Sequence, residues 1–203
     1  MFNRHPYLTI AVLLLAAFLY HQGTEGKKFP SFMAVRETPI QTNVSFEPFA
    51  FKEYTIKPFA EFNVKAVVLS AHRYFWGRAG ELVPVDLALG WGPMSNGNVL
   101  KDLNIRQGNR WYFYSYRELP IPDGEIIANS ANMHLIAATP EVAGKIRKAR
   151  RGDIVEFRGY LVQVTAEDGW HWNSSQSRTD TGDGSCELVW VEEFDKVESP
   201  QMN

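Results

Sequence analysis

The chain has 203 residues, a formal net charge of −2, 45% hydrophobic residues and 22% charged residues. This length fits one domain of ordinary size, and the near-neutral charge argues against a broad surface for nucleic acid or anionic lipid. The single cysteine, Cys186, excludes an intramolecular disulfide and a thiolate metal cluster. Six tryptophans indicate that large rings provide much of the packing.

The apolar run of residues 7–20 (YLTIAVLLLAAFLY) carries no charge. As an α-helix it would span about 21 Å, and uncharged neighbours extend it toward the ~30 Å of a hydrocarbon core. We therefore predict a single transmembrane helix within an anchor over residues 1–23. A cleaved signal peptide is the first alternative, although the bulky residues 18–22 offer no small-residue cleavage site. An ordinary buried helix is the second.

Positive charges lie on both sides of this run, at Arg4 before it and at Lys27, Lys28 and Arg36 after it. The positive-inside rule therefore does not decide the orientation. The short tail before the run is typical of a signal-like layout. We predict a single-pass protein of the cytoplasmic (inner) membrane whose remaining chain faces the periplasm or the cell exterior.

Residues 24–50 are rich in glycine and proline and show no helical or strand period, which predicts a flexible linker. A β-rich domain over residues 51–196 and a tail over residues 197–203 complete the predicted organisation. Alternating or aromatic-rich apolar stretches predict strands. The predicted strands cover residues 62–69, 110–116, 154–165 and 186–194, with a hairpin partner at 170–172.

Other stretches are shorter or less regular. Residues 82–89 predict an irregular strand or a short helix, and residues 120–124 a turn. Thr139 as N-cap and Pro140 at the first position predict a helix over residues 140–149. Gly159 predicts a bulge or bend in its strand. The fold class is therefore mainly β with minor α, in the form of a small OB-like (oligonucleotide/oligosaccharide-binding-like) β-barrel.

The polar stretch of residues 174–185 is longer than a hairpin needs, and such loops are usually functional or disordered. Besides a solvated loop, two interpretations remain open. Asp180-Thr181-Gly182 matches the tripeptide of aspartic proteases, although no apolar strand precedes it. Asp180, Asp183 and Glu187 could bind Ca²⁺, although the EF-hand spacing is absent. Arg178 and Asp180 could also orient a bound ligand.

Cys186 could act as a nucleophile served by His134 or His171. No family-type signature surrounds it, and strand alternation places it on one face with Leu188 and Trp190. Inert packing of the thiol is therefore the simpler interpretation. His134 lies among apolar residues, which predicts a hydrogen-bonded core histidine.

No histidine pair shows local zinc spacing, and a site assembled from His72, His134 and His171 has no support, so we predict neither metal nor cofactor. Basic residues at 145–151 suit the carboxyl end of a helix and predict a solvated helix end. Trp111 and the other rings of 110–116 could stack sugars or bases. Alternation would bury about half of those rings.

Several short blocks carry a resemblance to other proteins. They are Gly90-Trp91-Gly92-Pro93, Asn132-Met133-His134, Gly152-Asp153-Ile154-Val155, Gly159-Tyr160-Leu161-Val162, Trp172, Ser174-Ser175, Arg178-Thr179-Asp180-Thr181-Gly182 and Cys186-Glu187-Leu188-Val189. Through these blocks, residues 60–194 resemble a group of uncharacterised bacterial membrane-anchored proteins. The resemblance implies a bacterial source and supplies no mechanism, because that group has no assigned activity.

Three functions are consistent with these features. The first is a membrane-anchored, non-enzymatic binding or assembly protein with a protein or envelope partner, using Arg178, Asp180, Asp183, His134 or Trp111. The second is a hydrolase or transferase that uses Cys186 with His134. The third is a saccharide- or nucleic-acid-binding barrel, with nucleic acid disfavoured by the charge. The sequence indicates no particular oligomeric state.

Overall fold

The computed structural model describes residues 26–175 and 186–198, and these residues form a mainly β fold. The strands are β1 (Ile40–Asn43), β2 (Phe49–Phe51), β3 (Tyr54–Arg73), β4 (Val85–Gly90), β5 (Leu103–Gly108), β6 (Trp111–Tyr116), β7 (Ser130–Ala137), β8 (Ile154–Ala166), β9 (His171–Asn173) and β10 (Glu187–Val197). The helices are α2 (Arg78–Leu82), the 3₁₀ helix η1 (Gly92–Ser95), α3 (Gly97–Leu100), α4 (Asp123–Ala128) and α5 (Pro140–Arg147). None of the helices in this part of the chain is long and apolar enough to cross a membrane. The predicted anchor, residues 1–23, lies outside the described residues.

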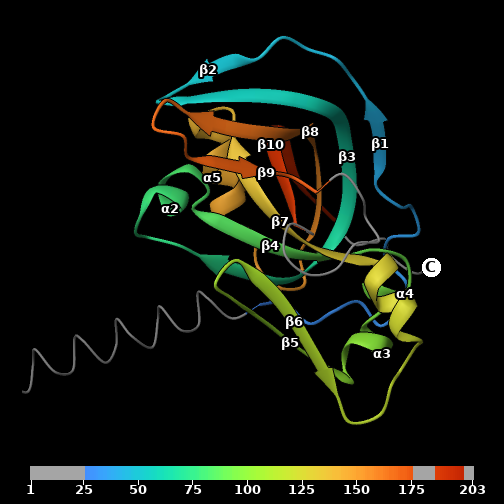
Figure 1. The fold of residues 1–203 in the computed structure, drawn as a ribbon. Helices are drawn as coiled ribbons and strands as arrows, with labels where there is room; N and C mark the ends of the chain where they lie inside the picture. Colours follow the sequence, from blue (N-terminus) through green and yellow to red (C-terminus); the bar gives the residue numbers. More distant parts are fainter. Residues whose placement is uncertain (1–25, 176–185, 199–203) are drawn as a thin grey trace, which may run out of the picture.

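One large sheet follows the order β1-β3-β4-β7-β10-β8-β9, with β2 paired to β3. The long strand β3 pairs with β8 over residues 54–67 and with β4 over residues 67–73. The pairings therefore run from β3 through β4, β7, β10 and β8 and return to β3. All of them are antiparallel except β7 with β10. Figure 1 shows β3 curving around the other strands.

The predicted alternation is present in β3, where Phe62, Val64 and Ala66 are buried while Asn63 faces outward. This is the period of two expected of a strand with one face on a core. The strands predicted at 110–116, 154–165 and 186–194 are confirmed as β6, β8 and β10. The sequence pattern thus locates β3, β6, β8 and β10 correctly.

The predicted helix at 140–149 is confirmed as α5. The Thr139 side chain accepts a hydrogen bond of 3.2 Å from Val142 N, and Pro140 occupies the first turn. Val142 and Ile146 are buried in the main core. Of the two possibilities predicted for residues 82–89, the structure shows the strand, β4, which begins at Val85, while α2 ends at Leu82.

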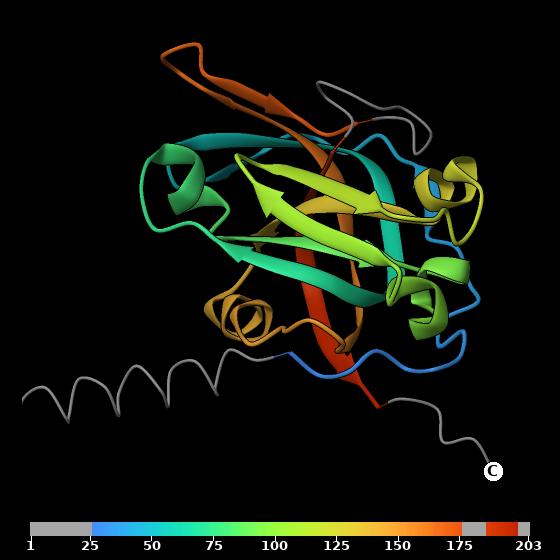
Figure 2. The same ribbon diagram turned by 90° about the horizontal axis from the view of Figure 1, so that it is seen from below.

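A second small sheet consists of β5 and β6, which form a hairpin inserted between β4 and β7. Figure 2 shows this hairpin lying across the front of the large sheet. Tyr112 and Tyr114 of β6 pack on the core, while Phe113 and Tyr116 are exposed. Burial raises the pKa of Tyr112 to about 12. The predicted half-burial of this aromatic strand is confirmed.

The structure differs from the flexible linker predicted over residues 24–50. Val35 is buried, Met33 forms a β-bridge with Asn96, and β1 and β2 both pair with β3. Residues 26–50 therefore pack against the domain. The prediction failed because these contacts are backbone pairings to distant segments, which need no local hydrophobic period.

Gly159 in β8 allows a close approach of two strands. A side-chain carbon at this position would overlap the carbonyl oxygen of Trp190 in β10. The bulge expected at Gly159 falls instead in the partner strand, between Val191 and Glu193. Position 159 therefore requires glycine, because a side-chain carbon does not fit between β8 and β10.

We predict that Gly159→Ala lowers the free energy of unfolding by about 2 kcal/mol, because the added methyl forces two backbones apart. Urea denaturation of the purified protein measures this change. The matched control is Gly144→Ala in α5, where no atom lies within 4 Å of the new carbon. That variant should gain up to about 1 kcal/mol from helix propensity. Equal stability of Gly159→Ala and the parent would contradict the packing described.

Candidate functional site

An open groove of about 500 Å³ lies where the β5–β6 turn, α2 and β9 approach β7. Its wall contains three tryptophans together with an arginine, a histidine and the cysteine. We call this set the tryptophan groove: Trp111, Trp170, Trp172, Arg110, His134 and Cys186. The exposed polar residues His171 and Asn173 lie at its edge.

Arg110 enters the groove from the two-residue turn between β5 and β6. The strands pair through Gly108 and Trp111, so Asn109 and Arg110 form the turn, with φ of 51° and 69°. Positive φ at both positions is the geometry of a type I′ turn, which suits asparagine and disfavours a bulky residue such as arginine. The turn therefore depends on contacts that Arg110 makes elsewhere.

Those contacts centre on Asp86 in β4, which has no exposed surface. Arg110 Nη1 lies 2.7 Å from Asp86 Oδ1 and also donates to Val83 O at 2.9 Å. His134 Nδ1 lies 2.9 Å from the same Asp86 oxygen, although the two atoms are not aligned as a hydrogen bond. A buried carboxylate requires such compensation by charge.

Tyr74 contacts both the guanidinium group and the backbone N–H of Arg110. The guanidinium carbon lies 3.5 Å from the centre of the Tyr74 ring, and Arg110 N donates to the Tyr74 hydroxyl at 2.8 Å. Burial raises the pKa of Tyr74, and the Asp86 carboxylate raises it further. The hydroxyl therefore stays neutral at physiological pH. Stacking on a ring and pairing with a carboxylate are the two interactions for which arginine is best suited.

Trp172 in β9 covers the histidine. Its ring centre is 4.8 Å from that of His134 and 5.3 Å from the Arg110 guanidinium carbon. Trp170 lies edge-on to Trp172 at 6.2 Å and also lies 4.7 Å from the Arg78 guanidinium. The rings of Trp170, just before β9, and of Trp172 in β9 therefore form one wall of the groove, and each is partly exposed.

Cys186 directly precedes β10 and lies beside Asn132 of β7. Asn132 Nδ2 lies 3.8 Å from Cys186 Sγ and 3.0 Å from Arg110 O, and Sγ is 3.8 Å from the same carbonyl. The predicted core histidine is confirmed as buried, with its Nδ1 turned to Asp86.

The structure thus brings together three predicted site residues, Trp111, His134 and Cys186. Three others, Arg178, Asp180 and Asp183, lie outside the described residues. Sequence reasoning missed Arg110 and Asp86. The asparagine of a Gly-Asn-Arg turn between two strands was the available signal for the hairpin, but nothing local marks the ion pair. Within the described residues, no cluster of three or more His, Cys, Asp or Glu side chains could hold a metal ion.

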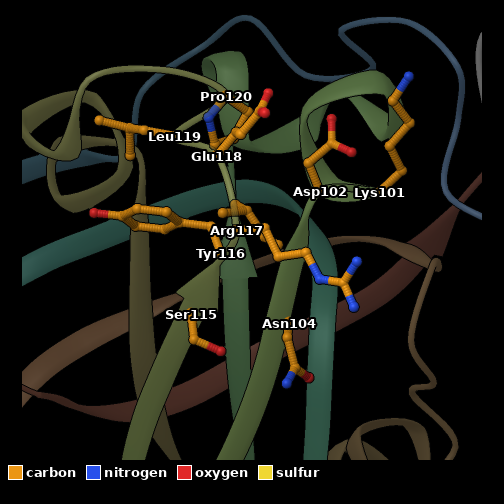
Figure 3. A pocket seen from close by; sticks show the side chains of 10 residues that line it. Lys101, Asp102, Asn104, Ser115, Tyr116, Arg117, Glu118, Leu119 and Pro120 are labelled. Carbon is orange, nitrogen blue, oxygen red and sulfur yellow. The ribbon is translucent and has the colours of Figure 1, made fainter.

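A second hollow lies at the open end of the β5–β6 hairpin (Figure 3). Lys101, Asp102, Arg117 and Glu118 line it, and all four are exposed. Figure 3 shows that these charged groups do not converge on one point. The hollow therefore lacks the convergent polar groups expected of a ligand site.

We predict that Arg110→Met lowers the free energy of unfolding by about 3 kcal/mol, because it leaves the Asp86 carboxylate buried without its cation. Asp86→Asn added to this variant should recover part of the loss, since the uncompensated charge is then removed. Urea denaturation of the parent, of the two single variants and of the double variant gives the coupling energy between Arg110 and Asp86. Purely additive effects would mean that the two side chains do not stabilise one another.

Trp111 of β6, His134 of β7 and Cys186, which precedes β10, meet in the tryptophan groove. Its chemistry combines aromatic faces, a paired arginine and polar edges. Comparison of the chain with protein-family models, with curated proteins and with solved structures finds no match.

Proposed function

We propose that this chain is a non-enzymatic binding protein, anchored in a membrane through residues 7–20, whose tryptophan groove holds a saccharide of the cell envelope. One observation carries the proposal: Trp111, Trp170 and Trp172 line a single open groove. The apolar run of residues 7–20 supports the membrane anchor.

The composition of the groove fits a sugar. One face of a pyranose ring presents C–H groups that pack on aromatic rings, while its hydroxyls need hydrogen-bonding partners around the rim. The partly exposed indoles offer such faces, and His171 and Asn173 offer donors and acceptors at the edge. Ligand sites typically combine apolar walls with a few placed polar groups in this way.

The charges near the groove favour a neutral ligand over a nucleic acid. Arg110 is paired with Asp86 at 2.7 Å, and Arg78 is paired with Asp168 at 2.6 Å. Proteins that bind single-stranded nucleic acid need cations that follow the phosphates in addition to stacking rings. The arginines described beside the groove are already neutralised by carboxylates.

The order of strand pairings supports an OB-like barrel. In chain order, the five strands are β3, β4, β7, β8 and β10. The first pairs with the second, the second with the third, the third with the fifth, the fifth with the fourth, and the fourth with the first. In the sequence, α5 lies between the third and the fourth of these strands. In OB folds, ligands bind on the second and third strands between the first–second and fourth–fifth loops. The groove contains Ala79 from the first of these loops and Trp172 from the other.

Catalysis by Cys186 is the alternative, and the presence of His134 in the same groove favours it. A nucleophilic thiol needs a base within hydrogen-bonding distance. Here Sγ contacts Asn132 and Arg110 O, and His134 Nδ1 is turned to Asp86. Alkylation of the folded protein by iodoacetamide faster than that of the unfolded chain would favour the catalytic alternative.

We predict that Trp172→Ala weakens saccharide binding about tenfold, which corresponds to ~1.4 kcal/mol, because it removes one wall of the groove. Titration of tryptophan fluorescence with soluble chito- and cello-oligosaccharides and with short oligonucleotides measures the affinities. Trp111→Ala should act in the same direction.

The matched control is Phe46→Ala, which removes an exposed aromatic ring that does not line the groove. Its affinity should equal that of the parent. Saturable binding of oligonucleotides with no response to any oligosaccharide would contradict the proposal.

A further inference from the structure

Basic side chains from three segments gather around the carboxyl end of α5. Lys27 N donates to Arg151 O at 2.7 Å, and Lys196 Nζ of β10 donates to Lys148 O at 2.6 Å. These contacts join the first described residues, the end of α5 and the last strand. We call the set the basic face: Lys27, Arg147, Lys148, Arg150, Arg151 and Lys196.

One carboxylate lies beneath this face. Asp153 is 2% exposed, and its oxygens lie 3.0 Å from Lys27 Nζ and 2.6 Å from Lys196 Nζ. Burial tends to raise the pKa of Asp153, but the two lysines and the N–H of Arg150 lower it by more, so that the pKa is below its usual value. Asp153 therefore stays ionised and holds the two lysines in place.

Two other members of the basic face add positive charge. Arg147 and Lys148 are exposed, and neither has a carboxylate within ion-pair distance in the part of the chain that the structure describes. Some cations elsewhere on the surface are paired, as in Arg158 with Glu193 at 2.6 Å and Lys145 with Asp195 at 2.9 Å. Positive charge therefore accumulates around the carboxyl end of α5, in a chain whose net charge is −2.

The chain leaves the described fold at the same place. Gly26 packs against Arg151, and residues 21–25 alone separate it from the apolar run of residues 7–20. Five extended residues reach about 18 Å at most. If residues 7–20 are embedded in a bilayer, the basic face is held close to the headgroups.

We infer that the basic face binds the headgroups of anionic phospholipids and so fixes the orientation of the domain on the membrane. The inference rests on the membrane anchor proposed above. Clusters of lysine and arginine beside a membrane segment are attracted to anionic lipid, and the attraction acts over about one Debye length, ~10 Å. Figure 2 shows α5 and β9 on opposite sides of the molecule, so this orientation turns the tryptophan groove away from the bilayer.

The test uses the full chain reconstituted into phosphatidylcholine vesicles with and without phosphatidylglycerol. An environment-sensitive probe is attached at Lys148→Cys in a Cys186→Ser background, and the vesicles contain a headgroup-linked quencher. The reference position is Glu167→Cys, on the exposed β8–β9 turn. Phosphatidylglycerol should increase quenching at position 148 about twofold or more and leave position 167 unchanged.

The second part of the quenching experiment uses charge-reversal variants. Arg147→Glu should abolish the increase at position 148, whereas Arg106→Glu, an exposed arginine of β5 outside the basic face, should preserve it. High salt should reduce the increase, because it screens surface charge. Both variants keep the backbone contacts described above.

The outcomes separate the two proposals. A chain that floats with the vesicles but shows equal quenching at position 148 in both lipids overturns the basic face alone. A chain that does not float overturns the anchor and this inference together, while the oligosaccharide titration still tests the groove. A probe at position 148 that responds to an oligonucleotide and not to phosphatidylglycerol overturns the lipid assignment in favour of nucleic acid.

Discussion

The buried ion pair between Arg110 and Asp86 is the contact on which the groove depends. Asp86 has no exposed surface, so its carboxylate requires a cation, and the hairpin turn supplies one at 2.7 Å. Arg110 in turn adopts a positive φ that is unfavourable for its residue type. Because the same guanidinium also stacks on Tyr74 and approaches Trp172, one side chain connects the hairpin, β4 and β9.

This arrangement explains how a small β domain presents aromatic rings without losing them to the core. The curved strand β3 and its partners bury one set of apolar side chains, while the β5–β6 hairpin and β9 extend from the sheet and carry Trp111 and Trp172. The basic face lies around α5, on the other side of the molecule (Figure 2). In the proposed account, one side of the domain faces lipid headgroups and the other faces a saccharide.

Much of the fold could be predicted because its strands carry local patterns. The alternation around Phe62 and the Thr139-Pro140 helix start are properties of neighbouring residues. The site was harder to predict. Asp86 lies in a stretch of apolar residues, and its partner Arg110 is 24 positions away, so no local spacing links them. The packing of residues 26–50 and the joining of Lys27 to the basic residues after α5 likewise depend on long-range backbone contacts. Such contacts have no signature in a single sequence.

Hydrogen exchange of backbone amides in the parent protein and in Arg110→Met tests the role of the ion pair most directly. Loss of the pair should speed exchange in residues 103–116 of the hairpin and in β9, while β3, β8 and β10 keep their protection. The reason is that a segment opens locally when the contacts that hold it to the rest of the fold are lost. Unchanged protection of the hairpin in Arg110→Met would contradict the account, since the groove would then be assembled without its central contact.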